Sequence, residues 1–307
     1  MRAALTALTD ELRRLKAIGV KSVSVTDESI AILRRVVADR KSAAKPLAPI
    51  AEPAPSVQAR GYELPVPAAS PKPPAPVVAP IATMPPPPKL TMPEGDRQTR
   101  WNALLAMVNG DVTCRSRLRP GKKVVLGVGS LEAQIMFVGE APGAEEEIQG
   151  EPFVGPAGQL LTKMILGMGL KRTEVYIGNI MNWRPDLPTA PGATQIGNRP
   201  PTEEEMRYCL PYLRAQIEIV NPALIVALGK TAAEGLLGFG AVKTLGEARG
   251  RWHEFAGKPM MVTYHPSYIL REPTNRKKRM IWEDLLMVME RAALPISERQ
   301  RGYFLDK

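Results

Sequence analysis

The sequence is poor in the residues that build disulfide frameworks, metal clusters and membrane spans. Its 307 residues include only two cysteines and two histidines. Two cysteines exclude a disulfide framework and fit a reducing compartment. No run of about 18 apolar residues occurs, which excludes a membrane-spanning helix, and the N-terminus lacks the apolar core and cleavage site of a signal peptide. We therefore expect a soluble, cytoplasmic protein.

Proline and positive charge are abundant instead. About half of the 31 prolines lie between residues 43 and 93, in stretches such as "PKPPAPVVAP" and "PPPP". Proline removes a backbone donor and fixes φ, so this stretch cannot sustain a helix or a central strand. The net charge of +10 makes a polyanion a plausible partner, although many basic proteins bind no nucleic acid.

These shifts in composition divide the chain into four parts. We predict a helical N-terminal segment (1–42), a disordered Pro/Ala-rich linker (43–95), a folded domain (96–294) and a C-terminal tail (295–307). The N-terminal segment has apolar residues at helical spacing. Its apolar faces suggest a protein partner or self-association, which the sequence does not name.

The folded part alternates short apolar strands with helices. Such strands are typical of a parallel sheet that is buried on both faces. We therefore predict an α/β fold, a three-layer α/β/α sandwich around a short parallel four-stranded sheet. The predicted strands are "AQIMFV", "EVYIGNI", "ALIVAL" and "PMMVTY", and the predicted helices span 157–169, 202–220, 230–237 and 277–293.

The loops that follow these strands should meet at one edge of the sheet, where such folds bind ligands. The first loop, "GEAPGAEEEIQGEPFVG", lacks the glycine and lysine spacing of phosphate-binding loops, and its row of glutamates would repel phosphate. The "GKT" at 229–231 lacks the upstream glycine of the full motif. A phosphate cradle is therefore not predicted.

Carboxylates beside glycines suit the cleavage of a glycosidic bond, because a carboxylate stabilises a cation-like sugar and orients water. His265 could donate to a departing base, Phe153 could stack on it, and Asn179 could read its edge. Each residue also has a structural interpretation: a solvated face for Glu145 and Glu147, core packing for Phe153, a turn cap for Asn179 and a structural histidine for His265. Their convergence at three strand ends favours the functional interpretation.

Three motifs in this order, "GEAPGAEEEIQGEPFVGPAGQLL", "NIMNWRP" and "HPSYILR", resemble the uracil-DNA glycosylase superfamily. Family 4, the iron–sulfur uracil-DNA glycosylases, is the most similar branch. The resemblance covers about residues 110–290. It implies a hydrolase of base-excision repair that acts on uracil in single- or double-stranded DNA and leaves an abasic site.

The resemblance also implies roles for individual residues. Glu140, Glu146 and His265 correspond to catalytic positions, and Gly139, Ala141, Phe153 and Asn179 to uracil-binding positions. The implied DNA-binding residues are Ser267, Arg271, Arg276, Lys277, Lys278 and Arg279. Base extrusion is required because a duplex shields the glycosidic carbon.

The chain departs from family 4 at the iron–sulfur cluster. Of the four ligand positions only Cys209 carries a cysteine; the other three hold Thr113, Ser116 and Trp183, with Cys114 one residue out of register. Two thiolates cannot hold a cluster that takes four. We therefore expect no cluster and no other cofactor.

Three hypotheses follow. The first is a monofunctional uracil-DNA glycosylase. The second is a non-catalytic DNA-binding or partner-recruiting protein on a glycosylase scaffold, and the third is a glycosylase for another deaminated base such as hypoxanthine. The retained carboxylates favour an enzyme, because a protein that only binds DNA gains nothing from negative charge beside it.

Overall fold

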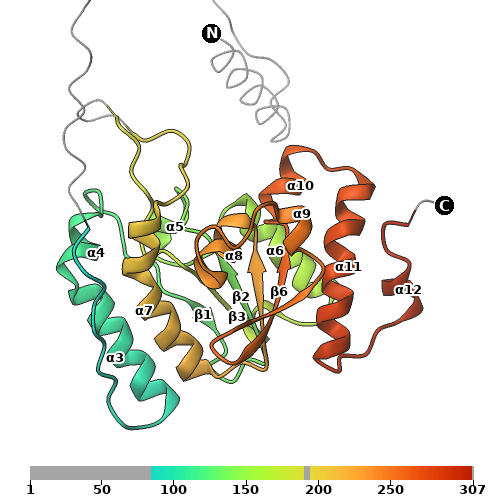
Figure 1. Ribbon diagram of the computed structural model, residues 1–307, viewed down its shortest axis with the longest axis horizontal. Coiled ribbons are helices and arrows are strands. Elements are labelled where there is room, and N and C mark those ends of the chain that lie inside the picture. Colours follow the sequence, from blue (N-terminus) through green and yellow to red (C-terminus); the bar gives the residue numbers. More distant parts are fainter. Residues whose placement is uncertain (1–83, 190–193, 306–307) are drawn as a thin grey trace, which may run out of the picture. The chain divides into compact units, whose positions relative to one another are not determined.

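A computed structural model describes residues 84–189 and 194–305 (Figure 1). Residues Pro76–Lys307 form one compact unit. The predicted helical segment 1–42 and most of the predicted linker lie outside the described residues. Within the described ranges, no helix is both long enough and apolar enough to cross a membrane.

The sheet has six strands in the order β1-β3-β2-β4-β6-β5. The four predicted strands form its parallel centre, β3-β2-β4-β6. The prediction of a four-stranded sheet is wrong because a short antiparallel strand is added at each edge. The strands are β1 (Val128–Gly129), β2 (Ile135–Gly139), β3 (Tyr176–Asn179), β4 (Leu224–Leu228), β5 (Trp252–Phe255) and β6 (Lys258–Thr263).

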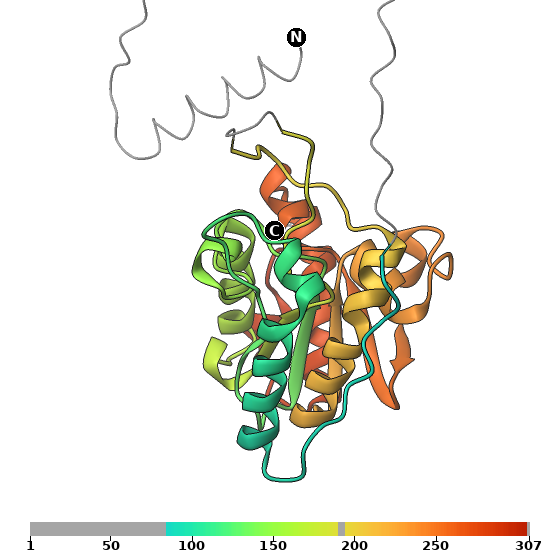
Figure 2. The same ribbon diagram turned by 90° about the vertical axis from the view of Figure 1, so that its left-hand side faces the viewer.

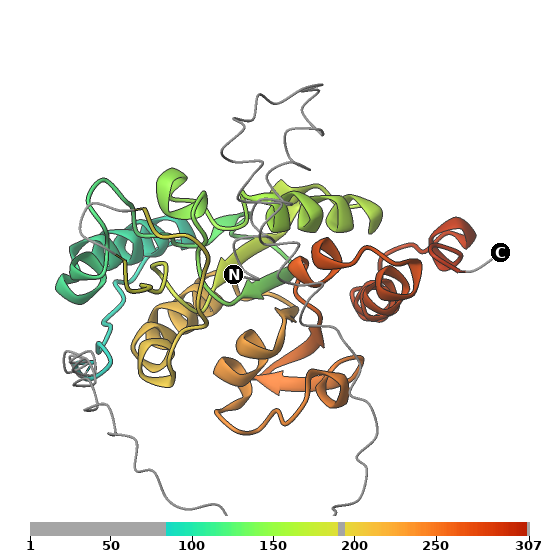
Figure 3. The same cartoon turned by 90° about the horizontal axis from the view of Figure 1, so that it is seen from above.

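Successive residues of each central strand point to opposite faces of the sheet. In β2, Met136 and Val138 belong to one apolar core, whereas Ile135 and Phe137 belong to the other. Helices α3, α7 and α8 cover the first face, and α6 and α11 cover the second (Figure 3). The two cores confirm the α/β/α layering.

Four helices were predicted from the sequence and all four are present, with ends that differ by at most two residues. They are α6 (Pro156–Gly167), α7 (Glu203–Val220), α8 (Lys230–Leu237) and α11 (Asn275–Arg291). The helices not predicted are α3 (Arg97–Gly110), α4 (Val112–Ser116), α5 (Glu146–Gln149), α9 (Leu245–Ala248), α10 (Ser267–Arg271), α12 (Glu298–Arg301) and the short 3-10 turn η1 (Arg172–Glu174).

The N-terminus of α7 has a capping box. The Thr202 hydroxyl accepts from the Glu205 backbone N–H at 3.2 Å, and the Glu205 carboxylate accepts from the Thr202 N–H at 2.8 Å. These bonds satisfy backbone donors that a helix start leaves open. The capping box fixes where the preceding loop, residues 185–200, joins the helix.

Both borders of the domain extend beyond the predicted ones. Met84, Leu90 and Met92, in the segment assigned to the linker, pack against the first core (Figure 2). In the segment assigned to the tail, the Gln300 amide donates to the Gly167 carbonyl at 2.9 Å, and its carbonyl accepts from the Trp282 indole N–H at 2.6 Å. The described C-terminal residues are therefore part of the domain.

Candidate active site

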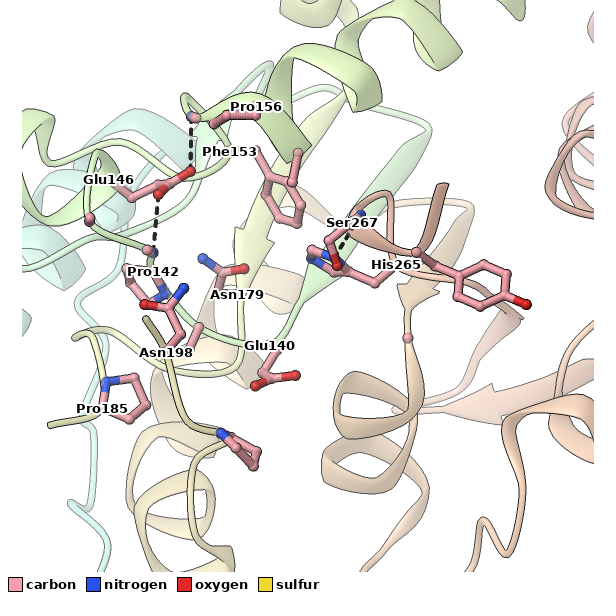
Figure 4. A pocket seen from close by; sticks show the side chains of 18 of the residues that line it. Glu140, Pro142, Glu146, Phe153, Pro156, Asn179, Pro185, Asn198, His265 and Ser267 are labelled. Atoms are coloured by element: carbon pink, nitrogen blue, oxygen red, sulfur yellow. Dashed lines mark hydrogen bonds between the residues drawn. The ribbon is translucent and has the colours of Figure 1, made fainter. Parts of the chain in front are cut away.

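A pocket of about 740 Å³ lies at the carboxyl edge of the parallel strands. Glu140 follows β2, Asn179 ends β3, Gly229 follows β4, and His265 follows β6. All four line the pocket. The convergence predicted from topology is thus present (Figure 4).

Asn179 lies at the bottom of this pocket. Its side chain is 6% exposed. The side-chain oxygen has no hydrogen-bond partner among the residues that the structure describes. A buried acceptor without a partner costs free energy, so this amide is arranged for a ligand that donates to it.

Phe153 lies beside Asn179 and is held by an unusual backbone conformation. Its φ is +55°, in the left-handed region that bulky residues rarely adopt. Gly139 provides the space: a Cβ there would lie 2.5 Å from the Phe153 ring and 2.5 Å from the Asn179 side-chain oxygen. Gly139 does not line the pocket itself, and it therefore acts by letting these two side chains approach.

His265 faces Phe153, with ring centroids 5.6 Å apart. The Ser267 backbone N–H donates to Nδ1 at 3.2 Å, and the Ser267 hydroxyl lies 2.9 Å from the same atom. Burial and the nearby Arg271 charge lower the His265 pKa to about 4. The ring is therefore neutral at pH 7, and because Nδ1 accepts, the proton is on Nε2.

The strand end below His265 is supported by a buried ion pair. The Arg249 guanidinium contacts both Asp284 oxygens, at 2.7 and 3.1 Å, and the Thr263 hydroxyl donates to Asp284 at 2.6 Å. Burial raises the Asp284 pKa to about 6, against the lowering effect of Thr263 and Arg249. This network ties β6 to α9 and α11.

The row of glutamates has three different environments. Glu145 is exposed and lines the pocket. Glu146 accepts from three backbone N–H groups, those of Gly143 (3.1 Å), Val154 (3.1 Å) and Gly155 (3.0 Å). These bonds position the loop that carries Phe153 (Figure 4), so the geometry gives Glu146 a positioning task rather than the predicted catalytic one. Glu147 is 4% exposed and pairs with Arg184.

Glu140 also lines the pocket, and its carboxylate makes fewer hydrogen bonds than the Glu146 carboxylate does. Burial raises its pKa, and a hydrogen bond with the Thr231 side chain partly offsets this. Thr231 belongs to the "GKT" segment, which opens α8. Ala141, the remaining predicted uracil-binding residue, also lines the pocket.

The predicted DNA-binding residues fall into two groups. Ser267 and Arg271 line the pocket. Arg276–Arg279 do not; they form the first turn of α11. Within this turn Arg279 donates to the Arg301 carbonyl (2.7 Å) and the Tyr303 carbonyl (3.0 Å), and Lys277 pairs with Glu272, whereas Arg276 is exposed.

Several pocket residues were not predicted. Tyr264 and Tyr268 stack at 4.3 Å between ring centroids. Asn198 and Arg199 line the opposite wall. The tyrosines are visible in the sequence as part of "TYHPSY", but nothing local to Asn198 indicates that its loop returns to the pocket.

Comparison with known proteins shows the family of the chain. Residues 126–286, more than half of the chain, match the model of the "Uracil DNA glycosylase superfamily". The chain belongs to the uracil-DNA glycosylase superfamily. It is 43% identical over 163 residues to the type-4 uracil-DNA glycosylase of Thermotoga maritima, an alignment that covers 53% of this chain and 79% of the relative.

Other relatives give the same picture. The type-4 uracil-DNA glycosylase of Archaeoglobus fulgidus is 41% identical over 160 residues, which is 50% of this chain and 75% of the relative. The type-5 enzyme of Pyrobaculum aerophilum is 32% identical over 170 residues, with 54% and 73% covered. The similarity to family 4 drawn from the motifs is confirmed.

Proposed function

We propose that this superfamily member hydrolyses the N-glycosidic bond of uracil in DNA and leaves an abasic site. The observation that carries the proposal is the buried Asn179 amide, whose oxygen has no hydrogen-bond partner among the described residues. It lies beside the Phe153 ring, in the pocket that the neutral His265 ring also lines. The identity of about 40% to enzymes named for this activity supports it.

Asn179 selects the base. Uracil presents an N3–H donor beside the O4 acceptor, which an amide matches with its oxygen and its NH₂ group. Cytosine presents an acceptor and a donor in the opposite order, so its N3 would face the Asn179 oxygen. Phe153 stacks on the extruded ring and holds it in this register.

His265 stabilises the leaving group. As the bond between C1′ and N1 breaks, its electron pair moves onto uracil, and negative charge develops on the ring and its O2. The Nε2–H of a neutral imidazole donates a hydrogen bond to this charge without transferring its proton. Glu140 stabilises the cationic sugar and orients the water whose hydroxyl group adds to C1′, while the remaining proton ends on uracil.

The DNA backbone is held by the rim. Arg271 lies beside the pocket. Four cations in the first turn of α11 (Arg276–Arg279) oppose the helix dipole, an arrangement that bound phosphates would relieve. Leu270, on the same rim, is 47% exposed and is suited to fill the space that the extruded base leaves.

An iron–sulfur cluster does not fit the residues at its expected place. Trp183 is fully buried there, with its ring centroid 6.2 Å from that of Tyr208. Cys114 and Cys209 are the only two cysteines of the chain, whereas the cluster takes four thiolate ligands. We propose that the protein works without the cluster; a colourless preparation without stoichiometric iron is expected, and a brown one would contradict this.

Single-turnover excision from an oligonucleotide with one uracil tests the function. Alkali converts any abasic product to a shorter strand. We expect His265→Ala to lower the rate by about 10²–10³-fold, because one preorganised donor to the developing charge is lost. His253→Ala is the matched control, since the only other histidine contacts the Ala248 carbonyl (2.8 Å) and does not line the pocket.

A wild-type protein that binds this DNA without forming abasic product would contradict the proposal. Equal rates for the two histidine variants would contradict the assignment of His265.

A further inference from the structure

One wall of the pocket is formed by the loop that follows the "NIMNWRP" motif. Its described parts are residues 185–189 and 194–200. Pro185 and Asn198 lie across the pocket from His265 (Figure 4), and Arg199 also lines the pocket. The loop follows Trp183, where the cluster-bearing branch has a cysteine. The structure shows what fixes this wall.

Arg184 is the centre of the support. Its side chain is 3% exposed. It makes three contacts: Nη1 donates to Glu147 Oε1 (2.9 Å), Nη2 to the Gly197 carbonyl (2.7 Å) and Nε to Asn198 Oδ1 (2.7 Å). A guanidinium presents its donors in a rigid fork, so these contacts fix the loop relative to α5.

Two further side chains complete the support. Arg119 contacts the second oxygen of Glu147 at 3.3 Å. Gln195, which is 4% exposed, donates to the Pro185 and Gly197 carbonyls (3.1 Å each) and accepts from the Leu187 N–H (3.0 Å). Glu147 thus joins the loop to the helix whose other carboxylate, Glu146, positions Phe153.

The contact with Arg184 decides what Asn198 can bind. Arginine has only donors, so the Asn198 atom that it contacts is the amide oxygen. The NH₂ group is left, and Asn198 is therefore presented as a donor. Asn198 is exposed, whereas Asn179 is buried, so a ligand of Asn198 would lie outside the base pocket. A ligand that only accepts hydrogen bonds would match the Asn198 NH₂ group.

We propose that Asn198 binds a backbone phosphate of DNA beside the extruded nucleotide, and that Arg184 is the positioning residue that orients it. The proposal rests on the proposed function, because it takes DNA as the substrate. The neighbouring cation is less available for this task, since Arg199 forms two 2.7 Å contacts with Glu205.

Binding to a DNA strand with one 2′-fluoro-2′-deoxyuridine, which resists hydrolysis, tests the proposal in the full-length protein. We expect Asn198→Ala to raise the Kd about tenfold, as for loss of a hydrogen bond to a charged group. Asn102→Ala, an exposed asparagine on α3 that does not line the pocket, is the matched control.

Salt dependence separates this contact from a cationic one. Loss of an uncharged donor releases no counterion, so the slope of log Kd against log salt should be unchanged in Asn198→Ala. Arg271→Gln should reduce that slope by about 0.9. A reduced slope in Asn198→Ala would contradict the proposed contact.

A double-mutant cycle tests the positioning role. We expect Arg184→Gln to raise the Kd as much as Asn198→Ala, Arg184→Lys not to restore it, and the double variant to bind no more weakly than either single variant. Arg207→Gln is the control for a neighbouring exposed arginine, whose side chain is 63% exposed. The proposal would be overturned if the increases in Kd of the two single variants multiplied in the double variant. It would also be overturned if Asn198→Ala bound DNA as tightly as Asn102→Ala.

Failure of the proposed function has a different signature. Wild-type protein that binds the resistant DNA but excises no uracil would refute the activity, while the Kd values of the variants would still decide the role of Asn198.

Discussion

The two sides of the pocket are held in different ways. On one side, His265 follows a buried strand and is fixed by Ser267, two residues away. On the other side, Asn198 lies on a long loop and is fixed by Arg184, 14 residues away, and through it by Glu147. The side with His265 depends on local geometry and on the Arg249–Asp284 ion pair behind its strand, whereas the facing wall is a loop whose position depends on the Arg184–Glu147 ion pair.

This difference indicates which parts of the fold keep their geometry when the sequence around them changes. A strand end and a short motif keep their geometry when surrounding residues change. A loop needs contacts that hold it, and in this chain the buried Arg184 and Gln195 side chains supply them. Next to the start of the loop, the fully buried Trp183 ring packs against Tyr208, whose hydroxyl donates to the Asp111 carboxylate (2.8 Å).

The largest expected effect is on stability, at Trp183. Removing this fully buried side chain in Trp183→Ala should leave a cavity and lower the free energy of unfolding by about 3–5 kcal/mol. Trp183→Phe should cost much less, because the indole N–H has no hydrogen-bond partner among the described residues. Denaturant unfolding measures both; equal losses would show that the indole is held by more than packing.

The sequence alone predicted the chemical side well. The four parallel strands and the placement of Glu140, Phe153, Asn179 and His265 follow from apolar runs and from loops at strand ends. The edge strands were missed because β1 has two residues and β5, "WHEF", has no apolar run. Helix α3 was missed because only Leu104 and Val108 of its residues are buried.

The facing wall could not be predicted. Glu146 and Glu147 are identical letters in one row, yet one binds backbone amides and the other a buried arginine 37 residues away. Such partners are brought together only by the tertiary structure, and the sequence around each residue does not indicate them. The predicted roles of Arg276–Arg279 and of the segment 1–42 stay predictions.

A smaller effect is expected from the ion pair behind His265. Asp284→Asn removes the charge that pairs with Arg249 in a largely buried place. Because the Asp284 pKa is raised to about 6, the folded protein already favours the uncharged side chain, so the free energy of unfolding should change little. The single-turnover rate should fall severalfold while the Kd for DNA is unchanged, whereas Arg184→Gln should raise the Kd.

Glu283→Gln is the control for Asp284→Asn. This neighbouring carboxylate is 52% exposed and pairs with Arg279, so its loss should cost no more than about 0.5 kcal/mol. An unchanged rate in Asp284→Asn would show that Ser267 alone positions His265.

The smallest expected effect concerns the pH dependence of the single-turnover rate. Protonation of His265 should not lower this rate near pH 6.5. An ordinary histidine with a pKa near 6.5 would be about thirtyfold depleted in its neutral form at pH 5, but the His265 pKa is lowered to about 4 by burial and Arg271. The Glu140 pKa is raised by burial, so the wild-type rate should first fall where this carboxyl protonates. In Glu140→Gln that step is removed, and the residual rate should stay constant from pH 7 to about pH 5.

The same shift has a consequence for stability. In the unfolded chain His265 takes up a proton below about pH 6.5, whereas in the folded protein it does so only near pH 4. His265 therefore lowers the free energy of unfolding as the pH falls from 6.5 to 4. His265→Gln should therefore become more stable relative to wild type as the pH falls from 6.5 to 4. A residual rate in Glu140→Gln that falls from pH 6.5, together with a pH-independent stability difference, would mean that His265 titrates normally, and its role as a neutral donor would be wrong.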